Sequence, residues 1–200
     1  MKSSRVVLIG LVLLLSGYLF LHSNAYGVWT RGLGYMNNSP DKYELSYHEI
    51  PGEYSLEIDL NDLESNVGKR IWQDGEQYIE VYLVDEREPK FGGGYRIFFQ
   101  SHGTYNLQEG TLTTGIKHLR LDLNIGGYDM QAKLSTKYND KIYDCNVQGM
   151  SGINEKDGDT FGFYVFPSKA YREDNVPLEN AGIVTVTISN LIEHRWVKIK

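Results

Sequence analysis

A run of oxygen-bearing side chains, Asn154 to Asp159, is the part of the sequence best suited to hold a metal ion. Carboxylate and amide oxygens at alternate positions suit Ca²⁺, which prefers oxygen ligands. The candidate ligands are Asn154, Asp157 and Asp159. The spacing does not match an EF-hand loop, and Asp-Gly is an ordinary turn dipeptide. A plain turn with no cofactor is therefore the favoured interpretation, and a Ca²⁺ site is the alternative.

Outward-facing aromatic residues are the strongest indication of a binding surface. Tyr78 and Tyr82 lie on the polar side of an alternating segment, and Tyr164 alternates with the apolar positions of another. Exposed aromatic rings stack on sugars or anchor protein partners. These three tyrosines are therefore candidate ligand-binding residues, for a glycan or an envelope protein. The alternative is that both faces of these strands are covered and the rings belong to the core.

A small basic patch is the second candidate for ligand contact. If the segments on either side of Gly126-Gly127 pair as a hairpin, Arg120 lies opposite Lys133, with His118 beside them. Such a patch on an acidic molecule would suit an anion or a partner. A solvated sheet face is the more common outcome for residues of this kind.

Catalytic motifs are absent from the sequence. It has no His-Glu-x-x-His, no Gly-x-Ser-x-Gly and no histidine pair at metal-ligand spacing. Carboxylate pairs such as Glu57/Asp59 and Glu76/Glu80 could serve a glycosidase once the fold brings them together. Pairs like these also occur by chance in an acidic chain, so no catalytic residue is predicted.

Cys145 is the single cysteine of the chain, which excludes an intrachain disulfide. It shares an apolar strand face with Tyr143 and Val147, while Asp144 and Asn146 point the other way. A small buried hydrophobic residue is the favoured interpretation, and a reactive or intermolecular thiol is the alternative.

The N-terminal 25 residues have the layout of an export signal. Lys2 and Arg5 precede an uncharged, apolar run over residues 6–21. This length lies between a cleaved signal core and a membrane span. Small residues at Ser23 and Ala25 suit cleavage before Tyr26, and a retained anchor is the alternative. In both cases the positive-inside rule places the rest of the chain outside the cytoplasm, secreted or tethered.

The charge balance argues against nucleic acid as a partner. The whole chain of 200 residues has a net charge of −6. The first 25 residues hold two basic side chains and no acidic one, so the remainder carries 18 basic and 26 acidic side chains, net −8. A body of this charge is repelled by phosphate backbones.

The elements that must position these residues are short strands. Apolar and polar residues alternate over residues 54–60, 78–83, 95–99, 118–125, 130–134, 143–147, 161–165 and 184–188, and residues 195–200 suit an edge strand. One short helix is expected over residues 62–67, capped by Asn61 and ended by Gly68. The pattern predicts an all-β, antiparallel β-sandwich of about eight or nine strands, with an N-terminal hydrophobic helix before it.

One hairpin can be predicted in detail. Gly126 and Gly127 suit a two-residue turn, because glycine adopts positive φ freely. Folding there pairs Leu121 with Ala132 and Leu119 with Leu134 on one apolar face.

The domain organisation follows from these segments. Residues 1–25 form a signal peptide or anchor, 26–45 an irregular linker, and 46–200 the β-sandwich. The sequence favours a non-catalytic binding module outside the cytoplasm. The alternatives are a secreted, carboxylate-dependent enzyme acting on polysaccharide and a structural or accessory subunit of a membrane-bound assembly.

Overall fold

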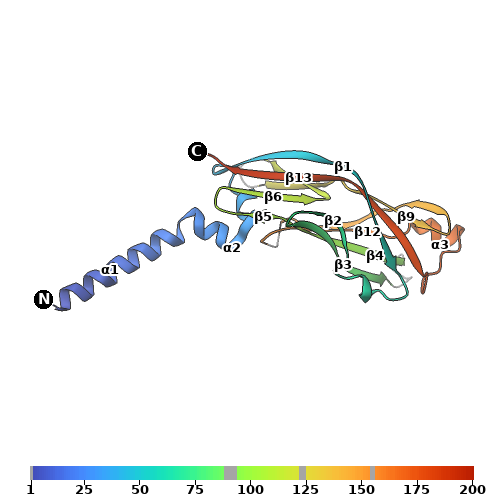
Figure 1. Cartoon of the computed structure of the whole chain (residues 1–200), viewed down its shortest axis with the longest axis horizontal. Helices are drawn as coiled ribbons and strands as arrows, with labels where there is room; N and C mark the ends of the chain where they lie inside the picture. Colours follow the sequence, from blue (N-terminus) through green and yellow to red (C-terminus); the bar gives the residue numbers. More distant parts are fainter. Residues whose placement is uncertain (1, 88–93, 122–124, 154–155) are drawn as a thin grey trace.

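The computed structural model describes residues 2–87, 94–121, 125–153 and 156–200, without the side chains of 2–10, 87, 120–121 and 125–126. Two antiparallel sheets dominate it, as the sequence predicts (Figure 1). The six-stranded sheet contains β10, β9, β13, β6 and β5 in this order, with β1 also paired to β13. Its strands are β1 (Tyr43–Asp59), β5 (Thr104–Tyr105), β6 (Glu109–Thr114), β9 (Lys133–Tyr138), β10 (Lys141–Asp144) and β13 (Ile183–Lys198).

The five-stranded sheet has the order β11-β12-β4-β3-β2. Its strands are β2 (Arg70–Asp74), β3 (Gln77–Arg87), β4 (Gly94–His102), β11 (Val147–Met150) and β12 (Thr160–Tyr164). A separate hairpin is formed by β7 (Ile116–Leu121) and β8 (Ile125–Met130). β3 and β4 also form a hairpin, and its loop lies outside the described residues.

The main core lies between the sheets, where alternate residues of each strand point inward. From β4 these are Tyr95, Ile97 and Phe99, and from β13 they include Val186 and Ile188, all at most 1% exposed. The sandwich prediction is confirmed, although β1 and β13 are much longer than expected. Residues 195–198 continue β13 instead of forming a separate edge strand.

The N-terminus forms two helices, α1 (Lys2–Leu21) and α2 (Asn24–Asn37). At 1.5 Å per residue, the 20 residues of α1 span about 30 Å. In the described part of the chain, one helical stretch near the N-terminus is long and apolar enough to cross a membrane. This agrees with a signal or transmembrane segment, as the sequence predicts.

The structure differs from the prediction over residues 26–39, where we expected an irregular linker and find α2. Its glycines lower helix propensity, and Gly32 is non-helical, with φ +52°. The helix forms because it packs: Val28, Leu33 and Met36 are buried in a second core with Trp196 of β13. β1 then begins at Tyr43.

The helix expected over residues 62–67 is a single 3-10 turn, Glu64–Asn66. Asp62 Oδ1, not Asn61, accepts the hydrogen bond from a backbone N–H of the turn, that of Ser65. Gly68 follows with φ +81°, as expected. One further helix, α3 (Ser168–Glu173), was not predicted.

The predicted register of the 116–130 hairpin is wrong. Leu121 pairs with Ile125, and Gly126 and Gly127 lie inside β8 opposite Arg120 and Leu119. At the open end of the hairpin, the Gln131 and Ala132 backbone N–H groups both donate to Gly115 O. Ala132 and Leu134 instead join the main core, and Leu134 pairs with Ile188 of β13. The spacing of the apolar residues fits both the predicted and the observed pairing. The observed pairing forms because Leu134 packs beside β13 instead of beside Leu119.

Candidate functional site

The outward side of the five-stranded sheet, which we call the outer face, is the candidate functional site. On β4 the inward residues are buried, whereas Arg96, Phe98, Gln100 and His102 alternate with them and are half-buried. Gln100 pairs with Glu80 of β3 and with Thr160 of β12. Since residues paired directly across antiparallel strands point to the same side, three neighbouring strands contribute side chains to this face.

Tyr78 lies in the middle of a stack of three planar groups at one end of the outer face. Its ring is stacked on His102, with centroids 4.5 Å apart and 21° between the planes. The Arg70 guanidinium carbon lies 3.9 Å from the Tyr78 ring centroid, in cation–π geometry. The stack holds the tyrosine ring in a fixed orientation without burying it fully.

A polar network surrounds the histidine of this stack. His102 Nδ1 lies 2.9 Å from Asp157 Oδ2, and His102 Nε2 lies 3.6 Å from Glu80 Oε1. Both carboxylates are partly exposed. The outer face therefore ends in a histidine held between two acidic groups, with an aromatic ring stacked on it.

Phe98 occupies the centre of the outer face. It pairs with Gly162 of β12, and a Cβ on that glycine would come within 2.4 Å of the Phe98 ring. The ring therefore lies across the glycine, because no side chain holds it away. Arg96, the next outward residue of β4, forms a two-bond ion pair with Asp85 of β3, with Arg96 Nε 2.7 Å from Asp85 Oδ1. A bidentate pair of this kind fixes both planes.

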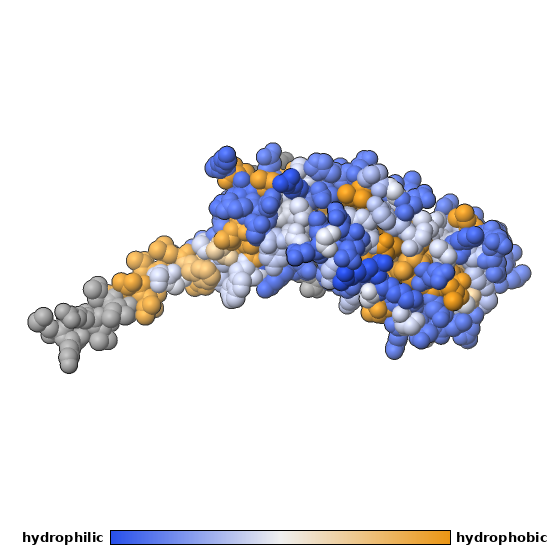
Figure 2. Space-filling model, viewed as in Figure 1, coloured by the Kyte–Doolittle hydropathy of each residue, from blue (hydrophilic) through white to orange (hydrophobic). Residues whose placement is uncertain are grey.

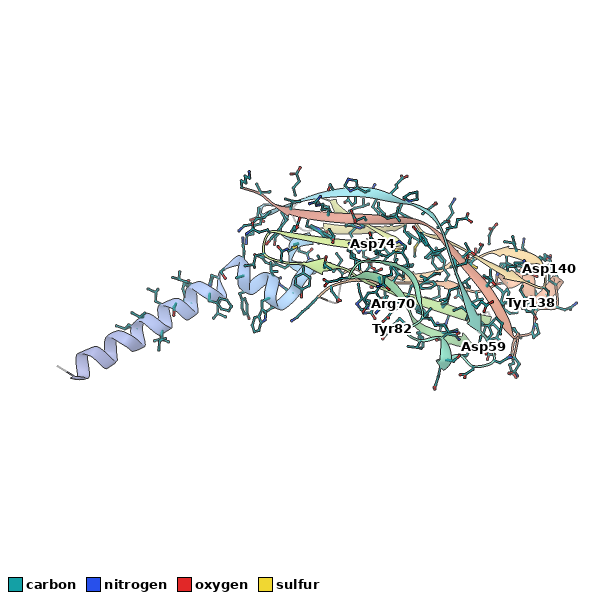
Figure 3. All side chains as sticks on the ribbon, in the orientation of Figure 1. Asp59, Arg70, Asp74, Tyr82, Tyr138 and Asp140 are labelled. Carbon is teal, nitrogen blue, oxygen red and sulfur yellow. The ribbon has the colours of Figure 1, made fainter. Side chains whose placement is uncertain are left out.

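The three predicted tyrosines all lie on β3 or β12 of this sheet. Tyr164 pairs with Arg96, and Tyr78 pairs with His102, six residues further along β4. These ends are about 20 Å apart at the usual strand rise. Tyr82 is 55% exposed, at an irregularity between Val81 and Leu83. Figure 3 labels Arg70 and Tyr82 on the adjacent strands β2 and β3.

The structure does not assemble the predicted basic patch. Lys133 is exposed on β9, where it pairs with Ser189 and not with Arg120. The Arg120 side chain lies outside the described residues. His118 is 2% exposed. The patch depended on the incorrect hairpin register.

A buried histidine cluster, which no pattern in the sequence predicted, joins β7, β13 and the segment just before β12. His118 Nε2 is 2.5 Å from Asp159 Oδ2, and Thr114 donates a hydrogen bond of 2.8 Å to Asp159 Oδ1. The His118 backbone N–H donates to His194 Nε2 at 3.0 Å. Tyr47 Oη in turn donates to the His118 carbonyl at 2.6 Å. These residues are far apart in sequence, so no spacing could have revealed the cluster.

Two of the three predicted calcium ligands face different histidines. Asp157 contacts His102 at the surface, and the buried Asp159 contacts His118. Asn154 lies outside the described residues. Among the residues that the structure describes, no group of three His, Cys, Asp or Glu side chains has the geometry to hold a metal ion.

Burial shifts the pKa values of two further groups, His194 and Cys145. The pKa of His194 falls to about 3, because burial and the nearby His118 charge both disfavour its protonated form.

Burial raises the pKa of Cys145 to about 12. Its Sγ lies 3.2 Å from both Thr136 Oγ1 and Val165 O. Val147, expected on the same apolar face, is 43% exposed, because β10 ends before it and β11 begins with it.

A second surface feature is an open hollow of about 480 Å³ beside β5, β6 and β13. Its lining includes three carboxylates, Glu76, Glu109 and Glu193, together with Arg195. Arg195 pairs with Glu109 at 3.1 Å. Two carboxylate pairs in the sequence could serve a glycosidase, although no catalytic residue is predicted from them. Of their members, only Glu76 is part of this hollow, since Glu80 lies beside His102.

Comparison with models of known protein families gives no match, and comparisons with curated proteins and with solved structures give no significant match. The fold and the outer face therefore define the class on their own: an antiparallel β-sandwich with an apolar N-terminal helix.

Proposed function

We propose that the protein is a membrane-anchored, extracytoplasmic, non-catalytic module that binds a glycan on its outer face. The observation that carries this proposal is the row of side chains along β4 and its neighbours. Phe98 and Tyr164 are interleaved there with paired polar groups and with the Tyr78–His102 stack on one open sheet face. Such a surface combines rings that stack on the apolar face of a sugar with groups that bind its hydroxyls.

The polar groups of the outer face suit hydroxyl recognition because neighbouring contacts hold them in place. Asp85 and Arg96 fix each other, as do Asp157 and His102. Fixed donors and acceptors lose little conformational entropy when a ligand binds. The face is about 20 Å long between Tyr78 and Tyr164, so an extended chain of several sugar units fits it better than a single sugar.

The fold also supports retention of α1 as an anchor. Cleavage before Tyr26 would cut inside α2 and remove Ser23, whose Oγ accepts a hydrogen bond from the Tyr26 backbone N–H. It would also remove Asn24, whose Oδ1 accepts a hydrogen bond of 3.0 Å from Tyr35 Oη. Residues just before the cleavage point thus belong to the folded body. The two basic residues in the first turns of α1, Lys2 and Arg5, favour an extracytoplasmic body.

A glycan array probed with the full chain in detergent micelles tests the proposal. Tyr82→Ala and Tyr164→Ala should each weaken binding to the selected glycan by about ten-fold, because each removes a ring that can stack on a sugar. The matched control is Tyr128→Ala, since Tyr128 is 49% exposed but lies on β8, away from the outer face. Equal loss in all three variants, or binding of no glycan, would contradict the proposal.

An enzyme acting on polysaccharide is a second candidate, favoured by the carboxylates of the 480 Å³ hollow. A pair of carboxylates at suitable separation is the requirement for glycoside hydrolysis. Release of reducing ends by the wild-type chain, abolished in Glu76→Gln and retained in Tyr82→Ala, would favour this function over simple binding.

A further inference from the structure

Three aromatic rings make a continuous contact across the junction between α1 and α2. The Phe20 and Tyr26 ring centroids are 5.9 Å apart, and those of Tyr26 and Trp29 are 6.3 Å apart. Trp29 is 66% exposed and Phe20 is 48% exposed. We call these three residues the aromatic collar. Large rings are rarely left so exposed on a soluble surface, and tryptophan and tyrosine are enriched where a membrane meets water.

The collar lies at the end of the apolar helix. In Figure 2 the coloured part of α1 is mostly hydrophobic, whereas the body is mostly hydrophilic. Residues 11–15 of α1 are all at least 58% exposed. An apolar helix with no protein partner for these side chains matches a lipid environment, and its C-terminal end then lies at the bilayer surface.

The connection between the helix and the body is short and hydrogen-bonded. Ser23 Oγ donates to Phe20 O at 2.6 Å and accepts from the Tyr26 N–H at 3.3 Å, which joins the two helices through one side chain. α2 is then held to the body by its buried residues Val28, Leu33 and Met36. Only residues 22–23 separate the helices, and two residues span at most about 7 Å. The α2 end of the body therefore stays next to the end of α1.

Several basic side chains lie at this end of an otherwise acidic body, with Asp41 next to Lys42. Arg31 and Lys42 flank the Tyr35 ring, at 4.9 Å and 5.3 Å from its centroid. The C-terminal segment joins them, since the Ile199 N–H donates to Lys42 O at 2.8 Å and places Lys198 and Lys200 nearby. Exposed cations next to a bilayer are attracted to lipid phosphates.

We propose that the aromatic collar inserts into the membrane–water interface and seats the α2 end of the body on phospholipid headgroups. Arg31 and Lys42 contact the lipid phosphates, while Phe20, Tyr26 and Trp29 lie at the level of the glycerol backbone. This inference rests on the proposed anchoring by α1. It has a consequence for the binding function. If contact with the headgroups fixes the orientation of the β-sandwich, the outer face has a constant orientation relative to the membrane.

Trp29 makes the test direct, because the other two tryptophans, Trp72 and Trp196, are 8% and 0% exposed. The full chain is reconstituted in phosphatidylcholine vesicles whose acyl chains are brominated either near the headgroup or near the chain end. Bromine quenches tryptophan fluorescence at short range. We expect strong quenching by the shallow bromine, weaker quenching by the deep bromine, and loss of most of this quenching in Trp29→Phe.

The charge contribution is tested in the same vesicles with added phosphatidylglycerol. Anionic lipid should increase the shallow quenching of Trp29 in the wild-type chain but not in the double variant Arg31→Gln/Lys42→Gln. The matched control is Lys133→Gln/Lys137→Gln, which removes two exposed charges from β9 and should respond as the wild type does.

Two negative results can be told apart, one for the anchoring by α1 and one for the insertion of the aromatic collar. If the chain leaves the vesicles in alkaline carbonate, the anchoring by α1 is wrong, and the inference falls with it. If the chain stays in the vesicles while Trp29 is unquenched by either bromine, the anchor stands and the seating of the collar is wrong.

Discussion

Asp159 Oδ2 lies 2.5 Å from His118 Nε2, and through this contact the loop before β12 is joined to β7. Both residues are at most 2% exposed. The backbone of the same segment hydrogen-bonds to β4, since the Ser101 N–H donates to Asp159 O and the Gly103 N–H donates to Asp157 O. One short loop therefore connects the hairpin, the five-stranded sheet and the buried histidines.

Removing the charge of Asp159 should destabilise the protein. In Asp159→Asn the buried His118 loses its carboxylate partner, and leaving a buried polar group without its hydrogen-bond partner costs about 1–3 kcal/mol. The measurement is the free energy of unfolding in urea, in detergent micelles. The control is Asp157→Asn, because the pair of Asp157 with His102 is partly exposed and should contribute about 1 kcal/mol or less. Equal losses in both variants would show that burial of the pair is irrelevant.

Stability should fall in acid because of His194. Its pKa is about 3 in the folded chain and 6.5 when unfolded, so between these values the unfolded state binds the additional proton. Unfolding free energy therefore decreases as the pH falls from 6.5 towards 3, by at most about 1.4 kcal/mol per pH unit. His194→Gln keeps an acceptor for the His118 N–H and should flatten this dependence. The comparison is urea unfolding at several pH values, and an unchanged slope in the variant would exclude His194 as its source.

Cys145 should be unreactive in the folded chain. With a pKa of about 12, about one thiol in ten thousand is ionised at pH 8, and the thiolate is the reactive form. An aromatic disulfide reagent at pH 8 should label the native protein very slowly and the urea-unfolded protein within the mixing time. Rapid stoichiometric labelling of the native chain would instead favour a reactive thiol.

Gly32 should be essential for docking α2. Its φ is +52°, and an added Cβ would lie 2.0 Å from the Lys156 carbonyl oxygen, which accepts a hydrogen bond from the Leu33 N–H. Gly32→Ala should therefore cost at least about 2 kcal/mol in unfolding free energy. Gly149→Ala is the control, because a Cβ there meets nothing within 4 Å, and its effect should stay within about 0.5 kcal/mol. A neutral Gly32→Ala would show that α2 docks without this close approach.

Alternation of apolar residues located most of the strands, because a strand buried on one face must repeat every second residue. The alternation did not predict a strand where the side that is buried changes along the strand. In β1, Leu56 and Ile58 face the main core, whereas Tyr43 lies in the second core under α2. The pairing of β1 with β13 is shifted between Ile50 and Glu53, and this bulge interrupts the period. The first half of β1 was therefore not predicted.

The tyrosines of the outer face were predictable as outward-facing residues, but not as one surface. Tyr78 and Tyr164 come from β3 and β12, which are separated by β4 in the sheet and by most of the domain in the sequence. Their partners, His102 and Arg96, carried no recognisable motif. Strand order, which depends on how the whole chain packs, placed them on the same face.

The sequence by itself determined the apolar N-terminal helix, the antiparallel sandwich and the acidic character of the body, because each depends on composition or on a local period. Only the tertiary structure decided that residues 24–37 form a helix, that Leu121 pairs with Ile125 in the hairpin, and that His118, Asp159 and His194 meet in the interior. Those outcomes depend on burial against strands that are distant in the sequence. The local pattern of one amino-acid sequence does not specify which distant surface a residue will contact.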